Sequence, residues 1–440
     1  MNINKYFSLA KENGIDEIEI KSQQRETFSV SLFRGEIENY TFSSTSKLTS
    51  RGIFNGKMGF SQTEKDDSST LLFLINQIKE SASNNELDDK AIIFKGSEKY
   101  KKRNFYNKEL DKLTPEDKIA LLHKIDEKIK SLDNRICDIN IAFEDSKVNY
   151  ILANSHGLNL KEHDNSFYIV ASCVAKDGDE VKTAYLPFVG TDLKEFDLDS
   201  FANKLVTNAL SLLHGTNIKN GTYKMVFSKK VCATLINNLL SHASSEAVQK
   251  NTSLFKDKLN TQVISDKLTI SEEPLKEKLF YSYFDDEGVA KYNKVIIDKG
   301  VLKTYFYNLE TALKDGVSST ANGRTSEGSK SYITYDNIVI KNGRTTFDGL
   351  LKKVNKGIYI SEVTGLHAGL DANSGDFSLQ SEGYAIENGK ITHALGLFTI
   401  SGNLFTLFNN VLAVGNDSEL LVNSFKTPSI AFKGIKYQAS

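Results

Sequence analysis

The sequence predicts an α+β protein with two domains: a first half in which helices alternate with antiparallel strand meanders, and a strand-rich second half. Three observations support this prediction. The chain has 440 residues, more than a single core of typical size accommodates. The first half contains the same order of segments twice: a helix, a stretch in which apolar and polar residues alternate, and another helix. Each of these two repeats is called a pass. The second half carries several hairpin signals but one long helical pattern.

The first pass begins with a short helix predicted at 4–13. Apolar and polar residues then alternate through "DEIEIKSQQRETFSVSLFRGEIENYTFSSTSKLTSRGIFNGKMGF", with turns at Arg34-Gly35 and Asn55-Gly56. This pattern predicts an antiparallel meander. A helix at 71–82 follows, because "LLFLINQIKESA" has helical periodicity.

The second pass begins with a helix for which Thr114 is a good N-cap and Pro115 suits the first helical position. A second meander is predicted from 136 to 189, with turns near Asp145-Ser146, His156-Gly157 and Asp177-Gly178. A helix around 193–213 closes this pass.

The polar stretch "HGTNIKNGTY" separates the two halves. We predict an N-terminal domain at 1–213, a linker at 214–222 and a C-terminal β-rich domain at 223–440. One long helix is expected at about 228–250. Hairpins are expected in "KVIIDKGVLKTYFY", "NIVIKNGRTTF" and "YAIENGKITHA", the last two through Asn-Gly turns. The polar segment at 314–331 is predicted to be a functional or disordered loop.

Composition excludes several classes of protein. The net charge of −1 gives no electrostatic footprint for nucleic acid, so no direct nucleic-acid partner is expected. Three scattered cysteines make no disulfide framework. No apolar run resembles a signal peptide or a membrane span. We therefore expect a soluble, cytoplasmic protein with no membrane partner.

The predicted long helix carries Cys232, His242 and Glu246. His242 and Glu246 are four residues apart, which places two side chains one above the other on a helix. Cys232 lies about 15 Å away along the axis, too far to share an ion with them. Two ligands are fewer than a zinc site needs. The pair is therefore predicted to be a partly buried His–Glu pair, or to line a wet cavity.

Other chemical signals are weak. HExxH, CxxC, GxSxG and phosphate-loop motifs are absent. Asp285, Asp286 and Glu287 precede a glycine, which favours a turn over a set of catalytic carboxylates.

The second half resembles a known family. The motifs appear in the order "DDEG", "NGR", "SGDFS", "IENGK", "GN" and "GND", within "SYFDDEGVAKYNKVIIDKGVLKTYFYNLETA", "STANGRTSEG", "GIYISEVTGLHAGLDANSGDFSLQSEGYAIENGKI" and "ISGNLFTLFNNVLAVGND". This order resembles the TldD/PmbA family, once labelled "modulator of DNA gyrase". The resemblance covers essentially the whole chain and is densest from about residue 224 onward.

The TldD branch of that family is similar to zinc peptidases. It has HExxxH on a helix early in the C-terminal half and a cysteine near the C-terminus. The resemblance implies that the histidines and the cysteine hold zinc, and that the glutamate acts on zinc-bound water. Aligned through "TSLFKDKLNTQV", this chain has Ile236, Asn237 and Ser241 at the three motif positions, and no cysteine follows Cys232. That pattern is similar to the PmbA/TldE branch.

The resemblance therefore implies a non-catalytic subunit of a heterodimer with a TldD-like metallopeptidase. The pair would enclose the zinc in a chamber that unfolded or extended peptides reach. No cofactor is expected in this chain, zinc is expected in the partner, and a homodimer is possible when the partner is missing. Family members are implicated in maturing a peptide-antibiotic precursor and in degrading a labile antitoxin.

Six residues are candidates for a cavity or a peptide-binding surface: His242, Glu246, Asn322, Arg324, His367 and Asp376. Arg324 would clamp a peptide carbonyl or carboxylate, or lie on the surface. His367 lies between glycines, which let a backbone approach a ligand closely, or is structural. Asp376 is expected at a strand-entry turn, bonding nearby backbone N–H groups.

Two alternative functions stay open. The first is an independent peptide hydrolase built on His242, Glu246 and His367. The second is a binding module that acts on another protein without proteolysis.

Overall fold

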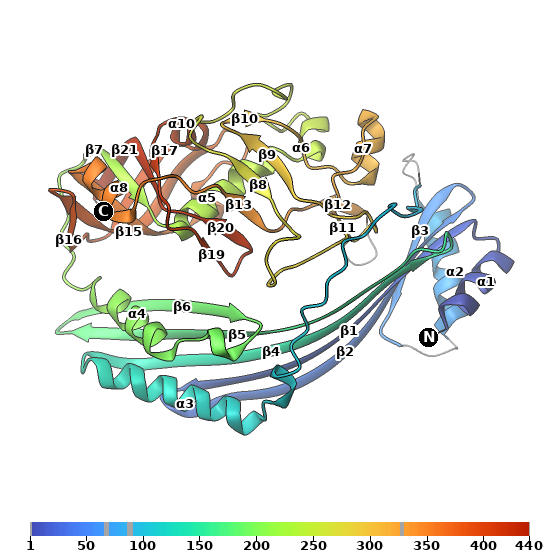
Figure 1. The fold of residues 1–440 in the computed structure, drawn as a ribbon, viewed down its shortest axis with the longest axis horizontal. Helices are drawn as coiled ribbons and strands as arrows, with labels where there is room; N and C mark the ends of the chain where they lie inside the picture. Colours follow the sequence, from blue (N-terminus) through green and yellow to red (C-terminus); the bar gives the residue numbers. More distant parts are fainter. Residues whose placement is uncertain (1, 66–69, 86–90, 326–329, 440) are drawn as a thin grey trace.

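The computed structural model describes residues 2–65, 70–85, 91–325 and 330–439. It is a mixed fold in which a long curved antiparallel sheet with four helices precedes a compact, strand-rich second half (Figure 1). The α+β prediction is therefore confirmed. The domain limits at 213 and 223 stay a prediction, although β7 begins at Gly221 within the predicted linker.

The two predicted passes build one sheet rather than two. Its strand order is β3-β2-β1-β4-β5-β6, so the passes join where β1 pairs with β4. The strands are β1 Glu17–Phe33, β2 Glu36–Phe54, β3 Lys57–Thr63, β4 Ile136–Asn154, β5 Asn159–Asp177 and β6 Glu180–Gly190. The helices are α1 Ile3–Glu12, α2 Thr70–Ser83, α3 Pro115–Leu132 and α4 Leu198–Leu210.

The four helices cover the two ends of one face of this sheet (Figure 1). Ile18 and Ile20, near the start of β1, pack with α1 and α2. Phe28 and Val30, further along the same face, pack with α3 and α4. Between these ends the strands are polar, because no helix lies over them to bury a side chain. Strands of 17 to 19 residues are long for a globular protein.

The second half contains two larger sheets and a hairpin, with orders β14-β7-β21-β17-β15-β16, β10-β9-β8-β13-β20-β19 and β11-β12. Its strands are β7 Gly221–Phe227, β8 Ile270–Glu272, β9 Lys294–Asp298, β10 Val301–Leu302, β11 Gly323–Thr325, β12 Ser331–Ile333, β13 Ile338–Ile340, β14 Gly357–Thr364, β15 Asp376–Glu387, β16 Lys390–Ala394, β17 Phe398–Asn403, β18 Val411–Val414, β19 Glu419–Leu420, β20 Phe425–Thr427 and β21 Ile430–Ala439. Its helices are α5 Lys229–Ser241, α6 Ser245–Gln249, α7 Leu309–Asp315, α8 Phe347–Val354, α9 Leu366–Gly369 and α10 Leu404–Asn409.

Helix α5 lies in the main core, in contact with strands of both larger sheets. Its buried residues cover slightly more than half of the helix surface, and they include Val231, Cys232, Leu235, Ile236 and Leu240. An apolar face this broad is typical of a helix that packs inside a core. Among the described residues, no helix is both long and apolar enough to cross a membrane.

Most predicted helices and turns are confirmed. Thr114 caps α3 in a reciprocal capping box with Asp117. Asn55-Gly56 and Asn388-Gly389 have positive φ and connect adjacent antiparallel strands. The predicted turn at Asp145-Ser146 is wrong, because β4 runs through it and pairs with β1 there. The polar middle of this long strand has the composition of a turn.

The predicted hairpin at Asn342-Gly343 is also wrong. The chain leaves β13 and runs toward α8 instead of returning antiparallel. The Gly343 N–H donates to the Gly415 carbonyl at 2.8 Å, and a side chain at Gly343 would collide with the backbone of Val414. The glycine therefore permits close backbone approach, which is the other common reason for a glycine in a tight segment.

Apolar contacts and hydrogen bonds hold the first sheet against the second half. Leu152, Leu158 and Leu160 form an apolar cluster with residues that include Tyr283 and Phe284. The extended segment at 91–109 runs between the two parts (Figure 1). In this segment the Tyr100 hydroxyl donates to the Gly288 carbonyl at 2.7 Å, and the Ser97 hydroxyl accepts from the Ala290 N–H at 3.0 Å.

Candidate functional site

The long helix predicted at 228–250 is interrupted, and this changes the geometry of the His–Glu pair. α5 ends at Ser241, with His242 as its C-cap, and α6 begins at Ser245. The interruption comes from Phe306, whose N–H donates to the Ala243 carbonyl and whose carbonyl accepts from the Ser245 N–H. These strand-like bonds replace helical ones, a tertiary effect that local periodicity does not reveal.

His242 and Glu246 consequently have different partners, so the predicted pair is wrong. His242 is buried, and its Nδ1 accepts from the Leu254 N–H at 3.1 Å. The ring meets Phe405 edge-on with centroids 5.0 Å apart. Burial lowers the pKa of this imidazole, and the backbone of Ala372 partly offsets that shift. Glu246 pairs with Lys250 at 2.6 Å, one turn along α6.

The three positions that correspond to the zinc motif do not fit a zinc ion. Ile236 is fully buried in the core. Asn237 accepts from the Tyr335 hydroxyl through its backbone oxygen at 2.7 Å and its Oδ1 at 3.0 Å. The Ser241 hydroxyl donates to the Asn238 carbonyl at 2.7 Å. Burial raises the pKa of the Cys232 thiol, so that thiolate is disfavoured as a ligand. Across the described ranges, no three His, Cys, Asp or Glu side chains gather into a group that would hold a metal.

Asp376 is bound to the cap of α10, the helix whose Phe405 contacts the His242 ring. Asp376 accepts from the Asn403 amide at 2.9 Å and from the Ser374 hydroxyl at 3.1 Å. Its partners are side chains rather than the expected backbone N–H groups. The contact joins the SGDFS motif to the GN motif, and Asn403 caps α10. His367 is exposed on the four-residue helix α9.

The DDEG segment forms the predicted turn, and that turn is bound to the NGR segment. Asp285 Oδ1 accepts from the N–H groups of Glu287 and Val289, at 3.0 and 2.9 Å. Its Oδ2 accepts from the Gly323 N–H at 2.9 Å. Asp286 Oδ2 accepts from the Thr325 N–H at 3.0 Å. A side chain at Gly323 would collide with the Glu287 carboxylate, so a glycine is required there.

Asn322 and Arg324 have structural partners. The Asn322 amide is buried and donates to the Glu272 carboxylate at 3.0 Å and to the Thr334 carbonyl at 2.9 Å. Arg324 lies in the β11–β12 hairpin, and its guanidinium pairs with Asp336 at 3.0 Å. The segment predicted as a loop at 314–331 thus contains buried residues and a strand. Its residues 326–329 lie outside the described ranges.

A buried layer of charge lies between the first sheet and the DDEG segment. Glu19 of β1 and Arg51 of β2 pair at 2.8 Å, with side chains 0% and 10% exposed. Lys21 of β1 donates to the Thr325 hydroxyl. Burial raises the pKa of the Glu287 carboxyl, and the Arg51 guanidinium opposes that shift. We call Glu19, Lys21, Arg51, Asp285, Asp286 and Glu287 the charged interlock.

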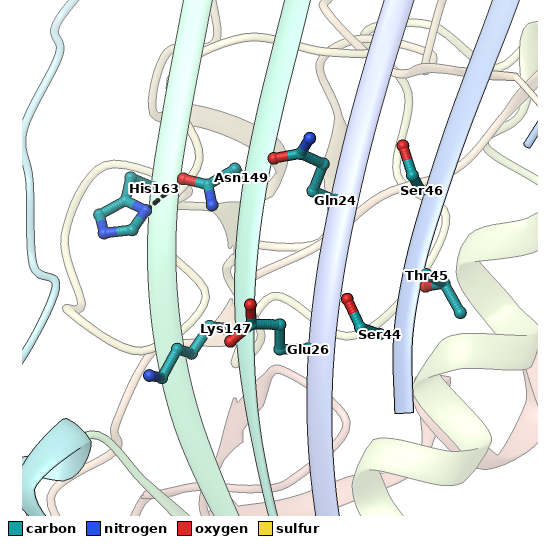
Figure 2. Close-up of a pocket in the computed structure, with 8 residues that line it drawn as sticks. All are labelled: Gln24, Glu26, Ser44, Thr45, Ser46, Lys147, Asn149 and His163. Atoms are coloured by element: carbon teal, nitrogen blue, oxygen red, sulfur yellow. Dashed lines mark hydrogen bonds between the residues drawn. The ribbon is translucent and has the colours of Figure 1, made fainter. Parts of the chain in front are cut away.

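A cavity of about 250 Å³ opens on the polar middle of the first sheet (Figure 2). None of the six candidate residues lines it. Glu26, Lys147 and Asn149 project there from β1 and β4, and the His163 Nδ1–H donates to Asn149 Oδ1 at 2.5 Å. The full lining is Gln24, Glu26, Ser44, Thr45, Ser46, Lys147, Asn149 and His163. The runs of polar residues in these strands were the available sequence signal.

Glu162 lines a second cavity of about 100 Å³, beside Asp164 and Tyr283. Burial, reinforced by the neighbouring Asp164 carboxylate, raises the pKa of Glu162 to about 7. Its Oε1 is buried without a hydrogen-bond partner among the residues that the structure describes. The sequence reasoning missed this residue, because only the fold brings the second half over β5.

The fold and the motif contacts define a class of protein: an α+β chain in which a long curved sheet precedes a strand-rich half whose sequence motifs bind one another. The chain belongs to the PmbA/TldD family. Three family descriptions match in order: PmbA/TldA metallopeptidase domain 1 at 18–82, central domain at 108–213 and C-terminal domain at 220–439.

Individual relatives agree with this assignment. A metalloprotease of Methanocaldococcus jannaschii is 28% identical, and the match covers 92% of this chain and 91% of that protein. The metalloprotease PmbA of Escherichia coli O157:H7 is 26% identical, with 71% and 67% covered. A Thermotoga maritima structure described as a candidate modulator of a DNA gyrase has a TM-score of 0.90 at 28% identity, covering 99% of each chain. TldE of Thermococcus kodakarensis shares the fold, with a TM-score of 0.92 at 23% identity and 100% of each chain covered.

Breaking the charged interlock should destabilise the chain strongly. Arg51→Met leaves the Glu19 and Glu287 carboxylates buried without that cation, which costs about 3–5 kcal/mol for a buried pair. Urea unfolding at neutral pH measures this loss. The control is Lys112→Met, which removes an exposed pair with Glu109 and should cost little. Equal stability of the two variants would contradict the role of the interlock.

Glu162 should make stability depend on pH. Its folded pKa of about 7 lies above its ordinary value of 4.5, so the folded chain keeps a proton that the unfolded chain has lost. The stabilisation is present below pH 4.5 and disappears as the pH rises through 7. Glu162→Gln cannot ionise. As the pH rises across this window, its free energy of unfolding should therefore rise relative to that of the wild type by on the order of 1–3 kcal/mol. Urea unfolding at several pH values tests this expectation, with the exposed Glu80→Gln as control. A pH-independent difference between Glu162→Gln and wild type would refute it.

Proposed function

We propose that this chain is the PmbA/TldE-like, non-catalytic subunit of a metallopeptidase whose zinc is held by a TldD-like partner. The observation that supports this proposal is which residues occupy the three motif positions and what they contact. Ile236 lies in the core, and Asn237 and Ser241 form hydrogen bonds with groups of their own chain. Zinc catalysis needs three protein ligands and an open position, and these residues supply none of the ligands.

Sequence identity alone does not assign the branch. Relatives named PmbA match this chain at 26% and 28% identity, and a relative named TldD matches it at 26%. The residues at the motif positions therefore carry the proposal. The substrate we propose is an unfolded or extended peptide, which the zinc of the partner would cleave. A cytoplasmic location remains an expectation.

The alternative of an independent hydrolase has little support in the geometry. It needs His242, Glu246 and His367 in one site. His242 is buried against Phe405, Glu246 is paired on α6 and His367 is exposed on α9. The alternative of a non-proteolytic binding module predicts capture of a partner protein without any product.

One experiment separates these three functions. The untagged chain is purified alone, its zinc is measured by elemental analysis, and an unfolded protein is incubated with the chain, with a TldD-like chain, and with both. We expect no stoichiometric zinc in this chain, and cleavage that requires the TldD-like chain and increases in the mixture. His242→Ala should leave cleavage by the mixture unchanged if circular dichroism shows a folded chain. One zinc per chain, or cleavage by this chain alone that His242→Ala abolishes, would favour the hydrolase. Stable capture without cleavage by the mixture would favour the binding module.

A further inference from the structure

The beginning of β5 lies at a border of the first sheet. β4 pairs with almost the whole of β5, whereas β6 pairs with it only from Phe167 onward. Among the described residues no strand pairs with the other side of 159–166, and the extended segment at 91–109 passes there instead (Figure 1). In this segment the Asn107 N–H donates to Asn165 Oδ1 at 2.8 Å.

The second half reaches the same border through Tyr283. The Tyr283 hydroxyl donates to the Lys161 carbonyl at 2.7 Å and accepts from the Lys161 N–H at 3.2 Å. Backbone groups alternate in direction along a strand, so the His163 N–H, two residues further on, points to this border as well. The His163 ring lies on the helix-bearing face, where it meets Asn149. The border therefore presents a backbone donor without the imidazole.

The cavity of about 100 Å³ lies where these three parts of the chain meet, and all three contribute to its lining. Typical small-molecule sites have volumes of about 300 Å³ or more, so this cavity suits a small ion better than a peptide or a nucleotide. Lys102, Arg103 and Lys161 line it. Within the described residues none of these three side chains forms an ion pair or a hydrogen bond. Cations that lack a counter-charge attract an anion.

The Glu162 carboxyl faces the same cavity as a neutral acid at and below neutral pH. Burial, with the Asp164 carboxylate beside it, raises its pKa to about 7. A protonated carboxyl has an O–H to donate, and the buried Oε1 has no partner among the described residues. The other titratable and charged groups that face Glu162 come from β4, β5 and the second half: Tyr150, Asp164, Tyr281, Tyr283, Asp286 and Lys291.

We propose that this cavity binds a small oxyanion of the size of sulfate or phosphate, between the cations of the extended segment and the Glu162 carboxyl. The anion would supply the counter-charge that Lys102, Arg103 and Lys161 lack, since Asp164 is the one fixed negative charge in the lining. It would also accept from the Glu162 O–H and the His163 N–H. Charge-assisted hydrogen bonds of this kind are the strong ones, and a guanidinium matches an oxyanion in shape.

Binding should be coupled to the proton on Glu162. The ionised carboxylate has no hydrogen to donate and repels an anion, so the affinity should be high below pH 7 and fall as the pH rises through 7. Sulfate is the suitable probe because its own charge does not change in this range. The site would join β5, the extended segment and the second half within one chain, and it does not depend on where zinc is bound.

The first test is isothermal titration with sodium sulfate at pH 6 and pH 8, against sodium chloride of equal ionic strength. Binding is the readout, because sulfate stabilises folded proteins generally by exclusion from their surfaces. We expect one saturable site per chain, with an affinity about tenfold weaker at pH 8, where about one Glu162 carboxyl in ten keeps its proton. The absence of saturable binding at pH 6 overturns the proposal.

Two variants locate the site. Lys102→Gln, Arg103→Gln removes two exposed cations of the lining and should abolish saturable binding. Its matched control is Lys99→Gln, Lys108→Gln, which removes the same charge from exposed positions of the same segment outside the cavity and should bind as the wild type does. Equal binding by the two double variants overturns the proposal.

Glu162→Gln tests the coupling to the proton. Its amide donates at any pH, so it should bind sulfate equally at pH 6 and pH 8. Circular dichroism checks that this variant is folded. A tenfold pH dependence that persists in Glu162→Gln overturns the assignment of the proton to this carboxyl.

Competition identifies the source of the anion. Inorganic phosphate and glycerol phosphate are each titrated against bound sulfate. Displacement by inorganic phosphate alone supports a site for the free ion, and tighter displacement by glycerol phosphate supports a site for the phosphate group of a small ester. Failure of both to displace sulfate overturns the proposal.

Discussion

The two halves meet at a buried layer of charge, in which Glu19 and Arg51 of the first sheet pair with each other and lie close to the DDEG turn of the second half. Neither charge is free to be solvated, so each needs the other and the groups around them. The opposing wall is the DDEG turn, whose Glu287 accepts from the Leu309 N–H at the start of α7 at 2.8 Å. One layer of charge thus positions the first sheet, the turn and a helix of the second half.

The family motifs are separate runs of sequence, but four of the six meet in pairs in space. DDEG is bound to NGR through Asp285 and Gly323, and SGDFS is bound to GN through Asp376 and Asn403. The GND segment is held by its Asp417 carboxylate, which accepts a hydrogen bond from the Ser429 hydroxyl at 2.8 Å. These polar residues satisfy one another, so they shape the fold rather than present reactive groups. This explains why motifs rich in Asp, Asn and Gly resemble a site without forming a metal centre.

The features that could be predicted from the sequence are those that depend on local interactions, such as helix caps and tight turns. The helix that starts at Thr114 and the hairpin at Asn388-Gly389 follow from capping and turn preferences, and both are confirmed. The errors have tertiary causes. Phe306 interrupts the helix at Ala243, and the backbone of Val414 takes the place of a hairpin partner at Gly343. The charged interlock was not predictable, because its residues come from segments more than two hundred positions apart and meet only when the sheet docks.

The distribution of exposed and engaged groups argues for a chain that works through its surfaces. The side chains at the positions that the family resemblance aligns with the zinc motif are buried or bonded within the chain, and the candidates His242, Asn322 and Asp376 have partners that fix the local structure. The first sheet differs, since its strands continue through a polar middle that no helix covers and end at an unpaired edge. Seventeen-residue strands are longer than two small helix-covered cores require. The extra length makes a wall and an edge, which suit the proposed role of a subunit beside a zinc-binding partner.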